Sequence, residues 1–228
     1  MKKNLFILFL LLSCIFCYAN DKENRTGFSV IAGDTYVYSK AYSANLNSFN
    51  FAIGCFNSDE DGLFDVVNSH YLGFNKGSVM NKDVEYDYKD YGVIRFTDDT
   101  KYHNIYLKDL YGVQANVLCF SFGAMIGTKI GVEWMSSDGF AGKFNCNYSF
   151  KEFDIYGNFV PQVYFSLNIL KFLKLSLTVD CDLPIIKFRM SKDSYDAKDI
   201  GDLPPNINWY FFEGDIPMTY SVGLTFFF

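Results

Sequence analysis

Apolar and polar residues alternate with a period of two in several segments of this chain. This alternation is clearest between Leu173 and Leu183, where every odd position is apolar and every even position is polar. Such alternation is typical of a β-strand with two unlike faces. The same pattern recurs in Lys143–Phe150, Gln162–Ile169 and Lys129–Trp134. The sequence therefore predicts an all-β fold.

The number and length of the alternating segments favour a closed barrel. Ten candidate strands cover Phe28–Tyr38, Leu46–Phe56, Leu63–Phe74, Val84–Phe96, 102–118, 120–135, 140–151, 161–170, 172–184 and the stretch from Tyr220 to Phe228. A tilted transmembrane strand needs about 9–11 residues to cross the hydrocarbon layer. We expect a closed antiparallel transmembrane β-barrel of eight strands, with two segments left as hairpin extensions. A barrel of ten strands is the alternative.

Period two does not say which face of the strands points inward. The 25 Phe and 17 Tyr residues exceed what an eight-stranded interior holds, because side chains just fill such an interior. The surplus rings therefore face lipid, with Tyr148, Tyr164, Trp134 and Trp209 as candidates for interfacial belts. The polar faces then line the lumen, through Lys129, Glu133, Lys143, Asn145, Asn147, Lys151, Lys174, Asp180 and Asp182. The alternative is a soluble, lipocalin-like barrel that buries its apolar faces and binds an apolar ligand.

The N-terminus reads as a secretory signal peptide over residues 1–19. Lys2 and Lys3 precede an apolar run from Leu5 to Cys17, and small residues precede a cleavage site between Ala19 and Asn20. Residues 20–228 would then form the barrel. The segment Leu11–Cys14 also resembles a lipobox, so lipidation of Cys14 is an alternative.

The connections between strands differ in length. Residues 136–139 and 170–172 read as tight turns, whereas residues near 191–215 form a long polar loop. Transmembrane barrels pair short periplasmic turns with longer outer loops. With the C-terminus in the periplasm, the long loop falls outside and both tight turns fall inside.

The closing strand carries a resemblance to a known class. Tyr220, Val222, Leu224, Phe226 and Phe228 form one apolar face that runs to the last residue. With the leader and the alternating strands, this resembles bacterial outer-membrane β-barrel proteins, in particular the small porin-like barrels of the OmpA- or OmpW-like kind. The resemblance implies location in a bacterial outer membrane. It also implies that these five residues are an insertion signal, with membrane lipid and the barrel-insertion machinery as partners.

Little in the sequence points to chemistry. His70 and His103 are the two histidines, and neither has the spacing of a nucleophilic site. We expect no catalysis, no metal site and no cofactor, with a lipid-modifying or protease barrel as the alternative. The net charge of −6 gives no basic footprint for nucleic acid. Outside the leader, Cys55, Cys119, Cys146 and Cys181 are expected to be free and lipid-facing, with a disulfide as the alternative.

The sequence thus predicts an integral outer-membrane barrel with a structural, surface-contact or adhesive role. Its outer loops would meet an extracellular ligand or a host surface. A narrow channel for small solutes is the alternative if the barrel has ten strands and a wet lumen.

Overall fold

The computed structural model describes residues 24–39, 44–59, 63–79, 85–88, 92–96, 100–141, 145–196 and 204–228. Twelve strands lie within them: β1 (Asn24–Ser39), β2 (Ala44–Asp59), β3 (Phe64–Val79), β4 (Glu85–Tyr88), β5 (Gly92–Phe96), β6 (Thr100–Val117), β7 (Phe120–Ala141), β8 (Cys146–Leu170), β9 (Leu173–Cys181), β10 (Leu183–Tyr195), β11 (Asn206–Phe211) and β12 (Met218–Phe227). Among these residues there is no helix with the length and apolar character needed to cross a membrane. The expected signal peptide, its cleavage site at Ala19 and Asn20, and Cys14 lie outside the described residues.

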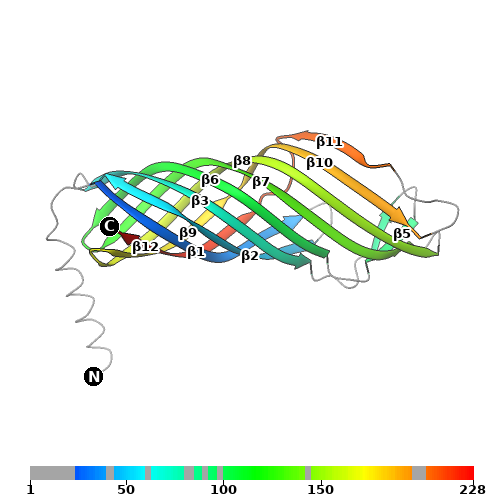
Figure 1. Cartoon of the computed structure of the whole chain (residues 1–228), viewed down its shortest axis with the longest axis horizontal. Coiled ribbons are helices and arrows are strands. Elements are labelled where there is room, and N and C mark those ends of the chain that lie inside the picture. Colours follow the sequence, from blue (N-terminus) through cyan, green and yellow to red (C-terminus); the bar gives the residue numbers. More distant parts are fainter. Residues whose placement is uncertain are drawn as a thin grey trace, which may run out of the picture.

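Eight strands close into an antiparallel ring in the order β1, β2, β3, β6, β7, β8, β9 and β12 (Figure 1). The ring is closed by β1 and β12, which pair from Gly27 with Phe227 to Tyr36 with Met218. The eight-stranded antiparallel barrel is therefore confirmed. The short β4–β5 hairpin is not part of the ring; it pairs with the end of β7 through Ile94, Arg95 and Phe96.

The polarity of the barrel is inverted relative to a soluble protein. Side chains that point into the ring are buried and mostly polar, including Ser69, Asn75 and Asp154. Side chains on the other face are apolar and exposed, including Phe122, Leu177 and Val222, each with at least half of its surface accessible. Such a surface is stable where acyl chains cover it, and a closed ring leaves no unpaired strand edge in lipid.

The interior also contains two apolar layers. One consists of Phe56, Val67, Leu110, Met125, Val160 and Tyr164, and the other of Ile31, Ala52, Tyr71, Tyr106 and Tyr156. Large side chains fill the centre of an eight-stranded barrel because little room remains there. The alternation is thus not purely polar inside, and several inward tyrosines supply both ring and hydroxyl.

Two strands of the ring, β7 and β8, run well past the others, and β10 and β11 lie outside the ring and continue the sheet beside β8. The strands β1, β2 and β3 have 16 residues each, whereas β7 has 22 and β8 has 25. The strand β10 continues β9 after the single residue Asp182 and pairs with β8 on one side and β11 on the other. We call residues 133–141, 146–155, 186–195 and 206–211 the wall. Figure 1 shows these strand ends projecting beyond β1, β2 and β3.

The wall corrects three expectations from the sequence. Residues 146–151 of the expected strand 140–151 and all of the expected strand 161–170 lie in one strand, β8, whereas Phe140 and Ala141 belong to β7. Residues 136–139 are not a turn but lie in β7. The expected long loop at 191–215 contains the end of β10 and all of β11. Residues 136–139, Ser-Ser-Asp-Gly, have no apolar side chain on either face, so the alternation stops there although the strand continues.

Candidate surface-contact site on the wall

The middle of the barrel is filled by buried ion pairs. The Lys108 ammonium donates to Asp180 at 2.7 Å, and both side chains are almost fully buried. Lys129 pairs with Asp182 in the same way. Lys129 also lies 4.2 Å from the centre of the Tyr106 ring, a cation–π contact. Side chains from strands that are not neighbours in the ring therefore meet inside the barrel.

The end of the interior nearer the chain termini holds a second polar cluster. The Asp65 carboxylate accepts hydrogen bonds from Ser58, Gln114 and Asn116. Above it, Lys174 donates to Gln114 at 3.1 Å and lies 4.0 Å from the centre of the Phe56 ring. The side chains in these contacts fill this part of the lumen.

At the foot of the wall, three carboxylates face two cations. Lys187 bonds Glu133 at 2.6 Å and Asp154 at 3.0 Å, and Arg189 contacts Glu152 and Asp154 at 2.9 Å each. Burial, followed by repulsion from Asp154, raises the pKa of Glu152 to about 8. Both cations contact Asp154, Lys187 at 3.0 Å and Arg189 at 2.9 Å. When Glu152 carries a proton, the cluster therefore has two negative and two positive charges.

The outer face of the wall carries an apolar row below a basic row. His103, Trp134, Phe153 and Met190 are aligned across β6, β7, β8 and β10. His103 stacks on Trp134, with 5.3 Å between ring centres. Two residues further along the strands, the aligned side chains are Lys101, Ser136, Lys151 and Lys192. An aromatic row followed by cations is the order expected from the edge of the hydrocarbon layer outward.

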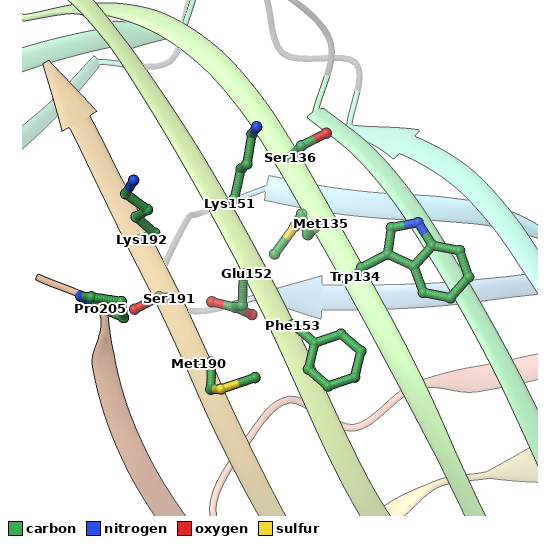
Figure 2. A pocket seen from close by; sticks show the side chains of 10 residues that line it. All are labelled: Trp134, Met135, Ser136, Lys151, Glu152, Phe153, Met190, Ser191, Lys192 and Pro205. Carbon is green, nitrogen blue, oxygen red and sulfur yellow. The ribbon is translucent and has the colours of Figure 1, made fainter. Parts of the chain in front are cut away.

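The β7, β8 and β10 residues of these two rows line a groove with a cavity volume of about 430 Å³. Trp134, Phe153 and Met190 contribute its apolar side, and Lys151, Lys192 and Pro205 line it farther out. In Figure 2 the two lysine side chains extend in the same direction, away from Phe153 and Met190. We call these six residues the groove. Its chemistry fits an anionic amphiphile, with acyl carbon against the rings and the anion between the lysines.

The structure distributes the predicted lumen residues over several environments. Lys129, Lys174, Asp180 and Asp182 are buried inside the barrel, and Glu133 is half-buried and faces the cluster at the foot of the wall. Two assignments need correction: Asn147 and Lys151 lie on the outer face of β8, since Cys146, Tyr148 and Glu152 point inward. Asn145 lies in a turn, exposed and with a φ of 49°, and Lys143 lies outside the described residues.

The structure also shows which face of the barrel the residues of the closing strand and the predicted belt residues occupy. Tyr220, Val222, Leu224, Phe226 and Phe228 are all exposed on the outer face. Trp134 and Trp209 lie on the outer face as well, but Tyr148 and Tyr164 are buried inside, which corrects their assignment to interfacial belts. Their hydroxyls donate to Asp193 and Gln114, so these tyrosines act as polar interior residues.

The cysteines and histidines differ from expectation in two respects. None of the four described cysteines is in a disulfide; Cys55 and Cys181 lie on the outer face, but Cys119 and Cys146 are buried and are not lipid-facing. His70 is hydrogen-bonded to Asp109 on the neighbouring strand, at 2.8 Å. Sequence reasoning missed this pair, because 39 residues separate its members and only the β3–β6 register aligns them. Within the described residues, no group of three or more His, Cys, Asp or Glu is placed to hold a metal ion.

A closed antiparallel ring with an apolar exterior and a hydrogen-bonded polar interior defines the class of integral outer-membrane β-barrels. The protein is a barrel of this class, located in the bacterial outer membrane. No protein-family model matches the sequence, and no curated protein matches it.

Solved structures of similar architecture include three bacterial proteins. A major outer membrane protein from Thermus thermophilus is 12% identical, covers 89% of this chain and 99% of its own, and has a TM-score of 0.48. Ail, the attachment invasion locus protein of Yersinia pestis, is 11% identical over 90% of this chain and 99% of its own, with a TM-score of 0.42. The translocator domain of the autotransporter NalP from Neisseria meningitidis is 7% identical over 99% of this chain and 95% of its own, with a TM-score of 0.33.

Proposed function

We propose that this barrel is a non-catalytic surface-contact protein and that the wall makes the contact. The observation that carries the proposal is the unequal length of the strands. The strands β7, β8, β10 and β11 continue past β1, β2 and β3, so one side of the barrel stands beyond the rest. A protein that only stabilises the membrane needs no such extension. A sheet rooted in a rigid barrel is instead a platform on which side chains hold fixed positions.

The filled interior favours contact over transport. The pairs Lys108–Asp180 and Lys129–Asp182 and the aromatic layers place side chains across the barrel axis. A channel for small solutes would need these groups to separate, and charges left unpaired in the interior are costly.

The groove suggests the chemistry of the contact. Lys151 and Lys192 lie directly opposite one another on β8 and β10, so two ammonium groups approach one anion. Trp134, Phe153 and Met190 supply apolar area next to these charges. We assign the groove to an anionic amphiphile presented at a membrane surface, such as a lipid with a phosphate headgroup.

Direct binding can be measured with the protein's own fluorescence. The chain has two tryptophans, so the variant Trp209→Phe leaves Trp134 of the groove as the single reporter. In nanodiscs of neutral lipid, we expect dihexanoyl phosphatidylglycerol, below its micelle concentration, to change Trp134 emission more than the phosphatidylcholine analogue does. Replacing both lysines by Gln in this background should weaken phosphatidylglycerol binding roughly tenfold or more, because each lost charged hydrogen bond contributes about 1.5–3 kcal/mol.

The matched control is Lys171→Gln in the same background. Lys171 is exposed in the turn between β8 and β9, at the opposite end of the barrel. This control should bind phosphatidylglycerol like its parent. Equal responses of the parent to both lipids would contradict the assignment of the groove.

A second assay addresses the surface-contact role itself. Bacteria that display the wild-type barrel should adhere to supported bilayers containing phosphatidylglycerol better than bacteria that display the Lys151→Gln/Lys192→Gln barrel. Equal adhesion would refute the surface-contact role even if the groove binds lipid.

A further inference from the structure

One part of the outer face is polar although it lies within the apolar band. His70 of β3 and Asp109 of β6 are opposite one another in the register, and 46% and 55% of their side-chain surfaces are accessible. Next to them, Asn57 of β2 donates to Asn68 of β3 at 2.7 Å. We call Asn57, Asn68, His70 and Asp109 the lateral patch.

Apolar residues lie on both sides of the lateral patch along the same two strands. On β3, Phe64 and Val66 precede it and Leu72 follows it; all three are more than half exposed. On β6, Leu107 lies on one side and Val113 on the other, both more than half exposed. The patch therefore does not mark an edge of the hydrophobic band but is embedded in it.

Polar groups facing acyl chains are unfavourable, because lipid offers them no hydrogen bonds. Nδ1 of His70 and Oδ1 of Asp109 share a hydrogen bond of 2.8 Å. This bond leaves the second ring nitrogen and the second carboxylate oxygen without a hydrogen-bond partner among the described residues. A water-soluble ligand does not reach this depth, and lipid headgroups lie above it. The missing partner must itself be embedded in the membrane.

We propose that the lateral patch is the centre of an interface between two copies of this chain. All copies insert in the same direction, so a two-fold axis along the membrane normal brings identical patches together at the same depth. The patch is complementary to itself, since it carries carboxylate and amide oxygens as acceptors and amide and imidazole N–H groups as donors. His70 and Asp109 of one copy then meet Asp109 and His70 of the other.

The chain carries a probe for this interface. Cys55 of β2 is free and exposed on the outer face, directly opposite His70 in the register. Cys181 also lies on the outer face, but on β9, three strands from β2 around the ring. The full-length protein, reconstituted in liposomes at a low protein-to-lipid ratio, can therefore be treated with a short, membrane-permeant bis-maleimide.

We expect a covalent dimer that persists in Cys181→Ala and disappears in Cys55→Ala. The double variant His70→Leu/Asp109→Leu should lower the dimer yield by about tenfold, equivalent to ~1.4 kcal/mol. The control Asp34→Leu, which removes an exposed carboxylate from β1 outside the patch, should leave the yield unchanged. A heat-dependent shift in gel mobility verifies that each variant has folded.

Two results would overturn the proposal. One is the absence of a dimer that depends on Cys55 in the folded wild-type protein. The other is an equal dimer yield from wild type and the leucine double variant.

Discussion

At the scale of single residues, the middle of the barrel depends on two buried ion pairs, Lys108–Asp180 and Lys129–Asp182. Lys108 and Asp180 are both nearly inaccessible, and Lys108 also lies 5.6 Å from the centre of the Tyr71 ring. In such a site the loss of one member exposes the other to a medium that solvates it poorly. The free energy of unfolding is therefore sensitive to how many members of a pair remain.

We expect Lys108→Met to lower the free energy of unfolding by about 3–5 kcal/mol, because Asp180 keeps its charge without its partner. The double variant Lys108→Met/Asp180→Leu should recover most of this loss. Urea unfolding in lipid vesicles, followed by tryptophan fluorescence, measures both. A double variant that is less stable than the single one would contradict this account.

Glu152 gives the wall a dependence on pH. Its pKa is raised to about 8 from the usual 4.5, so the folded wall binds a proton more tightly than the unfolded chain does. The resulting contribution to stability is complete below pH 4.5 and is lost as the pH rises through about 8. Hydrogen exchange of wall amides should therefore accelerate over this range beyond the intrinsic chemical rate. Glu152→Gln, which mimics the protonated acid, should reduce this pH dependence of hydrogen exchange. If the variant kept the pH dependence of the wild type, the effect would not come from Glu152.

At the scale of strands, tyrosine rings lie across glycines of the neighbouring strand. A β-carbon at Gly73 would lie 2.1 Å from the ring of Tyr106, whose hydroxyl donates to Asn50 at 2.5 Å. At Gly123 the ring of Tyr164 is similarly close, at 2.2 Å. Both tyrosines thus cover backbone that has no side chain of its own, and this sets where they point within the lumen.

We expect Gly73→Ala to lower the free energy of unfolding by about 1–3 kcal/mol, because the new methyl group displaces Tyr106 from a tightly packed interior. The matched control is Gly157→Ala. There the nearest atom to the added carbon is 3.3 Å away, the Cγ2 methyl group of Ile186. Urea midpoints of the two variants provide the comparison, and equal losses would argue against the packing role of Tyr106.

The strands also show which side-chain orientations and residue pairs can be predicted from the sequence. The alternation of β9 correctly placed its lipid-facing and interior residues, because both faces of that strand are under the constraint of the membrane. In the outer part of β8 the constraint is absent, so the same pattern wrongly assigns Tyr148 to lipid although it donates to Asp193 inside. The His70–Asp109 and Lys108–Asp180 pairs depend on register and on contacts across the barrel, neither of which periodicity encodes.

At the scale of the whole molecule, the filled lumen argues against passage of solutes through the barrel. The pure protein in a planar lipid bilayer should show no stepwise conductance, because ion pairs and aromatic layers occupy its axis. An open porin measured in the same bilayer serves as the positive control. Regular conductance steps in the folded barrel would favour the narrow channel instead.

The continuity of the wall with the barrel has a mechanical consequence. β8 is one uninterrupted strand from Cys146 to Leu170, hydrogen-bonded to β7 along 22 register positions. A tensile load on the far end of β8 acts parallel to that strand, and the interstrand bonds share it in shear instead of opening one after another like a zipper. A cell tethered through this sheet in flowing liquid would transfer the drag directly to the barrel embedded in its membrane, with no flexible linker between the point of attachment and the anchor.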